Sequence, residues 1–350
     1  MIIINARFLT QEITGVQRFA IEISLQLKEL IGNEILFVSP HNIKQRDYAK
    51  KLGAVTIGSH TGPFWEQIDL PIFLKKQNNP LLINLANMAP VFYKNKISTI
   101  HDVAFIEYPQ TFKKSFLYTY RFLIPLIINT SRQILTVSEF SKQEICKVYK
   151  IDNEKISIVY NAVSNQFKNN ENKELKSQLY FLAVSSLNYR KNFTAILKAF
   201  ELYSQTHKDI NLYVIGDIKN ANFKNININN YIRNPRIKFL GRITDKELID
   251  YYSNAIGFIY PSIYEGFGIP PLEAQACDCP ILISNIPSLK EIFQDSALYC
   301  NPYDISDIAR KMAFLSENSD IYIHKGKLNT KRFSWNKSAK ELIYIIQNIK

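Results

Sequence analysis

The chain repeats one pattern along most of its length, in which a short apolar run is followed by a stretch with helical periodicity. In the first half the apolar runs are MIII, ILFV, LLINL, ISTI and ILTV. After the first run, the segment VQRFAIEISLQLKEL keeps its apolar residues on one helical face: Val16, Phe19, Ala20, Ile23, Leu27 and Leu30. Short apolar runs that alternate with helices are typical of parallel sheets with right-handed crossovers. The pattern therefore predicts an α/β fold with doubly wound sheets.

The same alternation resumes in the second half, after a polar segment. Residues 161–178, NAVSNQFKNNENKELKSQ, are rich in Asn and Lys and are expected to form an interdomain linker. The runs YFLAV, NLYVIG, IKFLG, GFIYP, PILI and ALYC then follow. A length of 350 residues fits two domains of ordinary size. We expect two Rossmann-like domains, at residues 1–165 and 176–334, facing each other across a cleft that holds the active site.

Polar residues and prolines predict where several helices begin. Three pairs have the spacing of a capping box: Ser141 with Glu144, Thr244 with Glu247, and Ser288 with Glu291. Proline is favoured at the first helical position, so Pro270 or Pro271 is expected to begin another helix. Each of these starts leaves a loop between a strand and a helix, where α/β proteins bind their ligands.

The chain is basic, with a net charge of +12 from 43 Lys and Arg against 31 Asp and Glu. Such a surface favours anionic partners, namely phosphorylated small molecules, acidic lipid headgroups or nucleic acid. AT-rich codon usage, which also enriches Asn and Ile, explains the excess of lysine equally well. The sequence contains no motif for base recognition, so nucleic acid is not an expected partner.

The cysteines give no sign of disulfides or of a metal site. Cys146, Cys277, Cys279 and Cys300 are too few and too irregularly spaced for a disulfide framework. Cys277 and Cys279 lie too close together for a zinc knuckle and have no matching pair. The N-terminal stretch MIIINARFLT lacks the basic region of a signal peptide. A cytoplasmic protein is expected.

One segment is apolar enough to raise the question of a membrane. FLYTYRFLIPLII is interrupted by Arg121 and Pro125, and a spanning helix needs about 20 apolar residues. The wider segment PQTFKKSFLYTYRFLIPLII combines Lys113, Lys114 and Arg121 with many aromatic residues. It fits a patch that touches an anionic membrane, at the inner face of the cytoplasmic membrane. It fits equally well a domain helix with a solvated basic end.

The stretch YEGFGIPPLEAQACDCP follows neither a strand period nor a helix period. It places Glu265 and Glu273 eight residues apart, after the strand GFIYP, with Glu273 expected in the first turn of the next helix. Gly266 and Gly268 permit positive φ and a close backbone approach, and free N–H groups at such a loop bind anions. Carboxylates accept hydrogen bonds from hydroxyl groups. A ligand with both a diphosphate and sugar hydroxyls, a nucleotide sugar, satisfies both features; an ordinary turn with a helix-dipole glutamate is the alternative.

Two further strand ends carry polar candidates. Arg190 and Lys191, in AVSSLNYRKNF, follow the strand YFLAV and can neutralise a diphosphate and stabilise it as a leaving group. His101 and Asp102 follow the strand ISTI directly. The alternatives are a solvated basic pair for the first, and a capping or core histidine for the second. Placement at strand ends favours binding in both cases.

These motifs together resemble family 4 of the retaining glycosyltransferases. YEGFGIPPLE is similar to the E-x7-E motif of that family, YRKN to its basic pair, and SNIPSLKEIFQDSALYCNP to the segment after the motif. ILTVSEFSKQEI and ISIVYNAV resemble its interdomain region. The resemblance covers nearly the whole chain. It implies the GT-B fold, with the donor in the C-terminal domain and a last helix, residues 335–350, that crosses back to the N-terminal domain.

The resemblance also implies roles for the candidate residues. Glu273 would hold the ribose, and Glu265 the donor sugar or its developing charge. The donor diphosphate would be bound by two side chains and four loop positions: Arg190, Lys191, Gly15, Gly266, Phe267 and Gly268. His101 would lie near the transferred sugar, Asp102 would contact the acceptor, and Trp65 would lie on the cleft side.

The chain departs from the family pattern at two places. The family often has Gly-Arg where this chain has Ser185 and Ser186, so Arg190 is expected to do the work of the missing arginine. In TGVQRFA, Gly15 is kept but Gln17 stands at the second glycine of the family's N-terminal loop. No Asp-x-Asp metal-diphosphate motif is present, and the family is metal-independent, so no cofactor and no metal ion are expected.

The resemblance implies a retaining hexosyltransferase. It would transfer a hexose, mannose as the first choice, from a nucleoside diphosphate sugar to a saccharide or polyprenyl-linked saccharide acceptor in O-antigen or other surface polysaccharide assembly. The sequence has two alternative interpretations: a sugar-nucleotide epimerase on the same two-domain plan, and a protein that binds anionic surfaces or nucleic acid. Release of an epimerised donor without an acceptor would favour the first, and steeply salt-dependent binding to random DNA the second.

Overall fold

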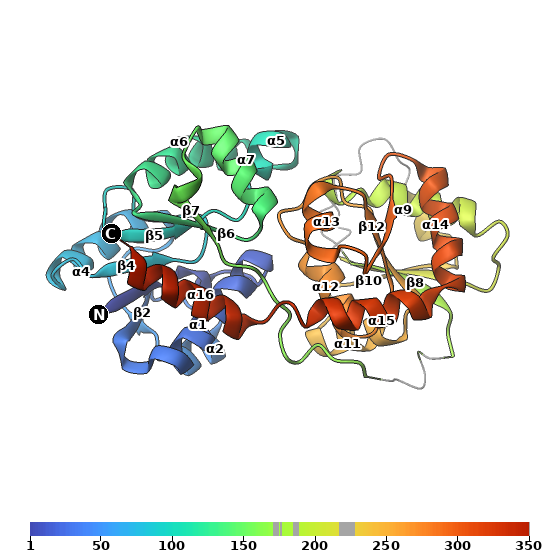
Figure 1. Cartoon of the computed structure of the whole chain (residues 1–350), viewed down its shortest axis with the longest axis horizontal. Helices are drawn as coiled ribbons and strands as arrows, with labels where there is room; N and C mark the ends of the chain where they lie inside the picture. Colours follow the sequence, from blue (N-terminus) through green and yellow to red (C-terminus); the bar gives the residue numbers. More distant parts are fainter. Residues whose placement is uncertain (171–174, 176, 185–188, 217–227, 350) are drawn as a thin grey trace. The chain divides into compact units, whose positions relative to one another are not determined.

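The computed structural model describes residues 1–170, 175, 177–184, 189–216 and 228–349. The chain divides into two compact units, Met1–Asn161 with Ser334–Lys350, and Ala162–Phe333 (Figure 1). The second unit thus begins earlier than residue 176. Within the segment expected to be a linker, Gln166 Nε2 donates to Asp245 Oδ2 at 2.7 Å and Asn169 Nδ2 donates to Asp278 Oδ2 at 2.7 Å, so these residues pack on the second unit. Residues 171–174 and 176 of that segment lie outside the described residues.

The first unit is built on a parallel sheet in the order β3-β2-β1-β4-β5-β6-β7. Its strands are β1 (Ile2–Asn5), β2 (Ile35–Ser39), β3 (Val55–Thr56), β4 (Leu81–Asn84), β5 (Lys96–Thr99), β6 (Gln133–Thr136) and β7 (Ile156–Ile158). Its α-helices are α1 (Gly15–Ile31), α2 (Arg46–Leu52), α3 (Gly62–Phe64), α4 (Leu70–Lys76), α5 (Ala104–Glu107), α6 (Lys114–Thr130), α7 (Glu139–Tyr149) and α16 (Trp335–Asn348). A π-helical turn, Trp65–Asp69, joins α3 to α4.

The second unit repeats this plan with a parallel sheet in the order β10-β9-β8-β11-β12-β13. Its strands are β8 (Tyr180–Val184), β9 (Asn211–Ile215), β10 (Ile237–Gly241), β11 (Gly257–Tyr260), β12 (Ile281–Ser284) and β13 (Leu298–Cys300). Its helices are α9 (Phe193–Tyr203), α10 (Ile228–Ile232), α11 (Asp245–Asn254), α12 (Ile269–Ala276), α13 (Pro287–Phe293), α14 (Ile305–Glu317) and α15 (Ser319–Thr330), with a 3₁₀ turn at Tyr189–Lys191. These two sheets confirm the predicted α/β fold with two Rossmann-like domains.

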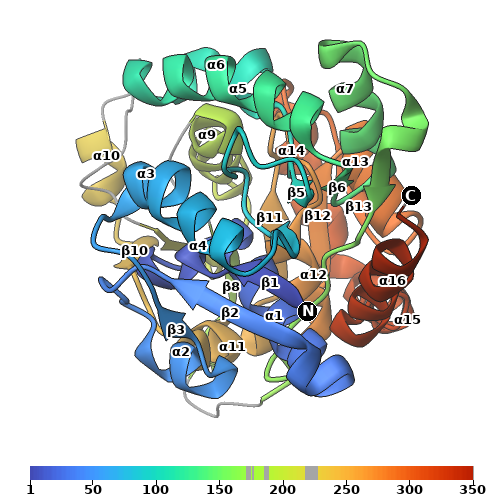
Figure 2. The ribbon, with the colours of Figure 1, turned by 90° about the vertical axis from the view of Figure 1, so that its left-hand side faces the viewer.

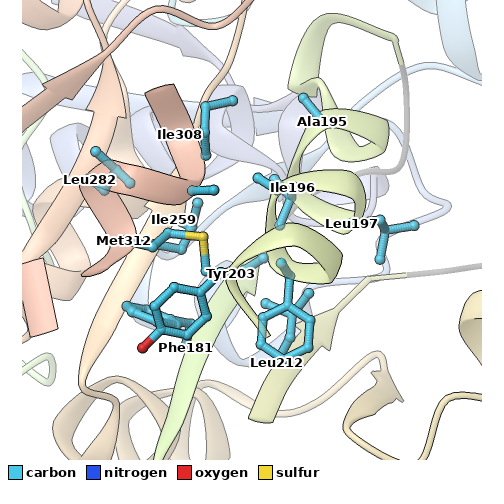
Figure 3. Packing of buried hydrophobic residues seen from close by; sticks show 14 of the residues in the cluster. Phe181, Ala195, Ile196, Leu197, Tyr203, Leu212, Ile259, Leu282, Ile308 and Met312 are labelled. Carbon is cyan, nitrogen blue, oxygen red and sulfur yellow. The ribbon is translucent and has the colours of Figure 1, made fainter. Parts of the chain in front are cut away.

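Buried apolar side chains hold each sheet to its helices. In the second unit, Phe181, Leu212, Ile259 and Leu282 of the strands meet residues of α9 and α14, among them Ile196, Leu197, Tyr203, Ile308 and Met312 (Figure 3). The apolar runs read from the sequence supply these strand residues. The two short strands β3 and β7 were not expected, because Val55–Thr56 is solvent-exposed and Ile156–Ile158 is very short.

The helix starts correct two of the sequence predictions. Thr244 caps α11 as expected: its hydroxyl accepts from Glu247 N at 3.3 Å, and its own N donates to Glu247 Oε2 at 2.8 Å. Ser141 does not open α7. The N-cap is Ser138, the first residue with a hydroxyl group after the end of β6. Its Oγ accepts from Ser141 N at 3.0 Å.

The predicted start of α13 was also wrong. This helix begins at Pro287, its N-cap is Ile286, and Ser288 lies inside the helix with its side chain buried. A proline at the first position has its φ fixed near the helical value and its missing N–H would be unpaired there in any case, which favours a helix start at Pro287.

The helix α16 completes the first unit, although it follows the second unit in sequence. It packs along α1, where the rings of Trp335 and Phe19 lie 6.0 Å apart. Ser338 Oγ also donates to the main-chain oxygen of Tyr160 at 2.7 Å. In the part of the chain that the structure describes, no helix is both long enough and apolar enough to cross a bilayer.

Candidate active site

In the second unit the strand order reverses between β8 and β11, which lie side by side. Ligands of open α/β sheets bind at the carboxyl ends of the strands at such a reversal. The 3₁₀ turn with Arg190 and Lys191 follows β8, and Glu265 follows β11. The two segments are tied together, because Ile263 N donates to the main-chain oxygen of Arg190 at 2.7 Å. The sequence motifs therefore meet at one place, as predicted from their positions at strand ends.

Asn192 fixes the position of the basic turn. Its Nδ2 donates to the main-chain oxygens of Pro261, at 3.0 Å, and Pro302, at 2.6 Å, which follow β11 and β13. Asn192 has a left-handed φ of 54°, a conformation that asparagine tolerates better than most residues. The asparagine of YRKN was not singled out from the sequence. Its place directly before a helix is the signal that identifies it as a structural clamp.

Lys191, Tyr260 and Glu265 form a closed triangle of hydrogen bonds at this site. Lys191 Nζ donates to Glu265 Oε1 at 2.6 Å and to the Tyr260 hydroxyl at 2.6 Å. The Tyr260 hydroxyl donates to the same Glu265 oxygen at 2.8 Å. The Glu265 and Lys191 side chains are only 10% and 16% exposed, so the ion pair is mostly buried but keeps some contact with solvent.

The surroundings of Glu265 favour its charged form. Burial raises the pKa of the Glu265 carboxyl, but the charges of Lys191 and Arg190, and hydrogen bonds to that carboxylate, outweigh burial and leave the pKa below its ordinary value. The pKa of Tyr260 is raised by burial and by the nearby Glu265 charge, which keeps its hydroxyl a donor. At neutral pH Glu265 is therefore an acceptor for hydroxyl groups and not a general acid.

The glycine loop needs one of its glycines for backbone geometry. Gly268 has a φ of 97° and is the N-cap of α12, and a Cβ there would lie 2.8 Å from Leu289 Cδ2. Gly266 is not among the residues with positive φ, so of the two glycines only Gly268 uses this freedom. The ring of Phe267 is buried against Phe333 at 5.5 Å, so only its backbone faces the loop. Of the three loop positions, Gly268 is therefore the one where the backbone conformation and the packing both favour glycine.

The helix after this loop starts one residue before the prolines. α12 begins at Ile269, which makes Pro270 its second residue and places Glu273 beyond the first turn. The two predictions, that a proline begins the helix and that Glu273 lies in the first turn, were wrong, because Gly268 in the left-handed conformation caps the helix. Glu273 is nearly buried. Burial raises the pKa of Tyr252, and the negative charge of Glu273 raises it further.

In the first unit, His101 lies at the carboxyl end of β5 with its ring buried. Its Nε2 lies 3.1 Å from the main-chain oxygen of Leu85, which can only accept, so Nε2 carries a proton. Burial lowers the pKa of His101, and the ring is neutral at pH 7. Its Nδ1 is then an acceptor. Asp102 Oδ1 accepts from Ala104 N at 2.9 Å, which uses one carboxylate oxygen to start α5.

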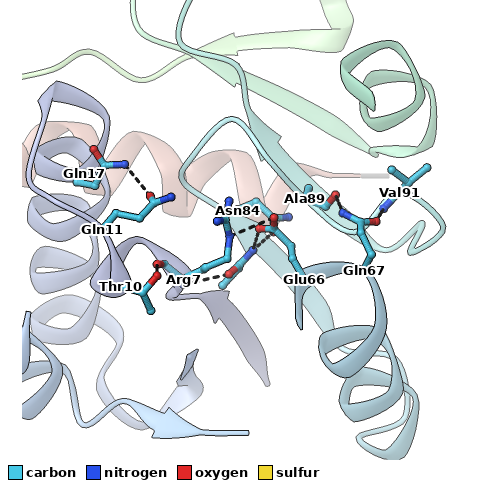
Figure 4. Close-up of polar contacts among 10 residues, drawn as sticks. Arg7, Thr10, Gln11, Gln17, Glu66, Gln67, Asn84, Ala89 and Val91 are labelled. Atoms are coloured by element: carbon cyan, nitrogen blue, oxygen red, sulfur yellow. Dashed lines mark hydrogen bonds and ion pairs between the residues drawn. The ribbon is translucent and has the colours of Figure 1, made fainter. Parts of the chain in front are cut away.

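Gln17 takes the place of the second glycine with a structural role. Gly15 is the first residue of α1, and Gln17 folds back over this helix start. Gln17 Oε1 accepts from Thr14 N at 3.2 Å, and its Nε2 donates to Gln11 Oε1 at 2.8 Å (Figure 4). The side chain therefore occupies the helix terminus that a glycine would leave open. The other departure, Ser185 with Ser186, lies outside the described residues.

A polar cluster that sequence reasoning missed lies where β1 and β4 end. Arg7 Nε lies 3.2 Å from Glu66 Oε2, and Asn5 Nδ2 donates to Glu66 Oε1 at 2.6 Å and to Asn84 Oδ1 at 2.9 Å (Figure 4). Glu66 is 1% exposed. The sequence carries one signal for this cluster: asparagines end two neighbouring strands, and they are register partners. The neighbouring Trp65 is fully buried and donates to the main-chain oxygen of Ile57 at 2.8 Å, so its side chain packs inside the unit.

Tyr120 of α6 reaches the same end of the first sheet. Burial raises the pKa of its hydroxyl, and the charges of Arg7, Glu66 and Asp102 act on it, as does a side-chain hydrogen bond with Asn87. Asn87 Oδ1 in turn accepts from His101 N at 3.0 Å. The carboxyl ends of β1, β4 and β5 therefore share one polar region. Within the described ranges, no three His, Cys, Asp or Glu side chains converge as metal ligands would.

Two Rossmann-like units with a basic turn and an E-x7-E loop at one strand reversal define a glycosyltransferase of the GT-B type. Family comparisons agree: the description "Glycosyl transferases group 1" matches residues 164–342, and "Glycosyltransferase Family 4" matches residues 13–167. The chain belongs to the glycosyl transferases of group 1.

Named relatives and solved structures extend the likeness over the whole chain. The O-antigen chain mannosyltransferase RfbU of Salmonella typhimurium is 29% identical over 86% of this chain and 87% of its own. The O-antigen chain mannosyltransferase B of Escherichia coli is 27% identical over 73% and 72%. The structure of Anabaena Alr3699/HepE in complex with UDP and glucose has a TM-score of 0.74 at 13% identity and covers 99% of both chains. The last likeness shows the fold.

Proposed function

We propose that the protein transfers a hexose, mannose as the first choice, from a nucleoside diphosphate sugar to a saccharide or polyprenyl-linked saccharide acceptor in O-antigen or related surface polysaccharide assembly. The names of both relatives, O-antigen chain mannosyltransferases, support the sugar and the acceptor class. The UDP and glucose bound to HepE support a nucleotide sugar as the donor class. The observation that carries the proposal is the ionised Glu265 beside Lys191 and Arg190 at the strand reversal of the second unit.

Donor binding would exchange partners within the Lys191–Glu265 pair. Without donor, the ammonium and the carboxylate satisfy each other at 2.6 Å. A diphosphate is the stronger partner for Lys191 and Arg190, since it brings more negative charge and more acceptor oxygens. Once Lys191 turns to the phosphate, Glu265 accepts hydrogen bonds from hydroxyl groups of the donor sugar. The same exchange places the Lys191 ammonium beside the phosphate oxygen that gains negative charge when its bond to the sugar breaks.

The proposed reaction keeps the anomeric configuration. The acceptor hydroxyl attacks the anomeric carbon on the face of the leaving diphosphate, the bond from that carbon to the phosphate oxygen breaks, and the proton of the acceptor passes to a phosphate oxygen. Glu265, being ionised, supports positive charge on the sugar during this step. Glu273 would hold the ribose, and the backbone N–H groups from Gly266 to Gly268 would face phosphate or sugar oxygens.

On the acceptor side, His101 would accept a hydrogen bond from a hydroxyl of the transferred sugar through Nδ1, since Nε2 donates to Leu85. Asp102 would contact the acceptor through Oδ2, since Oδ1 accepts from Ala104 N. Gly15 would bring the start of α1 to the donor phosphate. We propose further that no metal ion and no organic cofactor takes part, because Arg190 and Lys191 supply the positive charge. Transfer unchanged by excess EDTA would support this, and activity restored only by added Mg²⁺ or Mn²⁺ would contradict it.

A donor screen tests the proposal. Thermal shifts are measured with GDP, UDP, ADP and dTDP, and with their mannose, glucose, GlcNAc, galactose and rhamnose derivatives, for the unchanged protein and for Glu273→Ala. Stabilisation by one nucleotide that is lost in Glu273→Ala is expected, since ligand binding to the folded state raises the unfolding midpoint. No stabilisation by any nucleotide, in a folded protein, would overturn the proposal. Release of an epimerised sugar nucleotide without acceptor would replace it with an epimerase.

A further inference from the structure

Two helical segments of the first unit expose rows of apolar side chains. In the segment from α3 through the π-helical turn to α4, Phe64, Ile68 and Ile72 are exposed at a spacing of four residues. In α6, Tyr118, Phe122 and Leu126 are exposed at the same spacing. Residues four apart lie on one face of a helix, so each segment presents an apolar ridge to solvent.

Both ridges lie over the same side of the sheet. Leu82 of β4 and Lys96 of β5 are register partners in neighbouring parallel strands, so their side chains point to the same face. Leu82 packs with Trp65, Leu70 and Leu74 of the first helical segment. Lys96 Nζ donates to Thr130 Oγ1 of α6 at 2.7 Å. The view in Figure 2 agrees, with α4 and α6 on one side of the sheet and α1 and α16 on the other.

The loop between β4 and β5 joins the two ridges. Gln67 Nε2 donates to the main-chain oxygen of Ala89 at 2.9 Å, and Gln67 Oε1 accepts from Val91 N at 2.8 Å (Figure 4). Val91 also packs in the apolar cluster of α6. The next residue, Phe92, is 91% exposed. A phenylalanine this exposed has no packing role in the unit, and it stands beside the loop residue that both helical segments touch.

The exposed charges on the segments that carry these ridges, and on the loop between β4 and β5, are of one sign. Exposed cations on the same segments are Lys75, Lys76, Lys94, Lys113, Lys114 and Arg121. Residues 62–96 and 113–130 contain only two carboxylates, Glu66 and Asp69. Their side chains are 2% and 10% exposed, and both are paired, with Arg7 and His60. Residues 62–96 and 113–130, called the apolar-basic face below, therefore offer aromatic and aliphatic side chains with lysines and an arginine, and carry no exposed carboxylate.

We propose that the apolar-basic face docks on an anionic phospholipid bilayer. Phe92 and the two ridges enter the boundary between headgroups and acyl chains, and the cations contact lipid phosphates. A second copy of the chain would bring the same positive charges together, so charge complementarity favours lipid over self-association. Docking in the plane of the bilayer requires no spanning helix. The inference does not depend on which sugar is transferred.

Vesicle sedimentation with the full chain tests this proposal. Binding is compared on phosphatidylcholine vesicles with and without about one-third phosphatidylglycerol, at low and at high salt. We expect binding to the anionic vesicles only, and release as salt rises. Phe92→Ser combined with Phe122→Ser should lower the partition coefficient about tenfold, from the apolar area kept out of the bilayer. Lys113→Glu with Lys114→Glu should lower it by at least about tenfold.

Matched controls come from the opposite side of the sheet. Tyr344→Ser and Lys340→Glu, on exposed positions of α16, should bind vesicles like the unchanged protein. Thermal midpoints show whether each variant is folded, and the nucleotide screen above shows whether the donor site is intact. Three results would each overturn the proposal: no binding to anionic vesicles, equal loss in the control variants, or a concentration-dependent dimer in sedimentation velocity that Phe92→Ser with Phe122→Ser abolishes.

Discussion

Each of the two strand reversals of this protein holds an ion pair between a carboxylate and a basic side chain, but the surrounding structure holds the two pairs in different ways. Between β8 and β11, Glu265 meets Lys191 at 2.6 Å; between β1 and β4, Glu66 meets Arg7 at 3.2 Å. Both carboxylates are at least nine-tenths buried. In the second unit both partners come from loops beyond the strands. In the first unit Glu66 comes from a helix that packs on the sheet, and Asn5 and Asn84 connect it to two strand ends.

In the proposed function, this difference separates a pair that exchanges partners from a pair that fixes structure. Lys191 and Glu265 both lie in loops beyond the strand ends, so under that proposal a diphosphate replaces the carboxylate as the partner of Lys191. Glu66 joins its helix to Arg7 and to Asn5 at the end of β1, and its loss would leave Arg7 without its counter-charge and Asn5 with Asn84 as its remaining acceptor. Ion pairs of similar burial therefore predict opposite outcomes on mutation, in rate for one and in stability for the other.

The largest expected effect is on the exchangeable pair. Glu265→Gln should lower kcat about a thousandfold, because the charge that supports the developing positive sugar is lost. Nucleoside diphosphate should bind at least as tightly, since Lys191 no longer pairs with a carboxylate. Steady-state kinetics and calorimetric titration measure the two quantities. Nucleotide affinity that falls together with kcat would show that Glu265 acts on the diphosphate site itself.

The fixed pair should respond in stability. Glu66→Ala leaves the Arg7 side chain, which is only 13% exposed, without its counter-charge, which costs about 3–5 kcal/mol in the free energy of unfolding. The double variant Arg7→Met with Glu66→Leu should recover most of this loss, because an apolar pair of similar volume replaces both charges. Urea unfolding gives the free energies. Unchanged stability of Glu66→Ala with a raised KM for the acceptor would instead make this cluster a binding site and remove the contrast.

Lys96 sharpens the comparison, because it is a buried cation hydrogen-bonded to neutral groups. Its Nζ donates to the main-chain oxygen of Tyr93 at 2.6 Å and to Thr130, and burial, with the charge of Lys155, lowers its pKa from 10.5 to about 7. The unfolded chain then binds the proton more tightly than the folded chain. Relative to Lys96→Met, stability should rise with pH between about 7 and 10.5, by up to about 1.4 kcal/mol per pH unit. A difference that is flat across this window in urea unfolding would contradict a lowered pKa.

The smallest effect distinguishes the two loop glycines. Gly268→Ala should destabilise the second unit by about 1–2 kcal/mol, since alanine is strained at positive φ and its Cβ would meet Leu289. Gly266→Ala should cost less than this, because Gly266 is not at positive φ. Thermal unfolding of both variants measures the difference. Equal costs would mean that the close packing around the loop, and not φ, sets the requirement.

Sequence reasoning reached the site of the second unit because its residues lie in two short, contiguous motifs at strand ends. The strands themselves were predictable from apolar runs, since both faces of each sheet are covered. Arg7 and Glu66 were missed because their pairing depends on how a distant helix packs on the sheet. The wrong cap at Ser141 has a local cause: Ser138 has the same chemistry and comes first after the strand.

The return of α16 to the first unit sets an order of completion during synthesis. Residues 162–333 form the second unit as one uninterrupted stretch, whereas the first unit needs residues 334–349 to cover α1 with Trp335 and to bond Tyr160 through Ser338. The unit that leaves the ribosome first is therefore finished last. Until then the ring of Phe19 lacks its neighbour on α16, and the apolar face of α1 that α16 covers stays open to water.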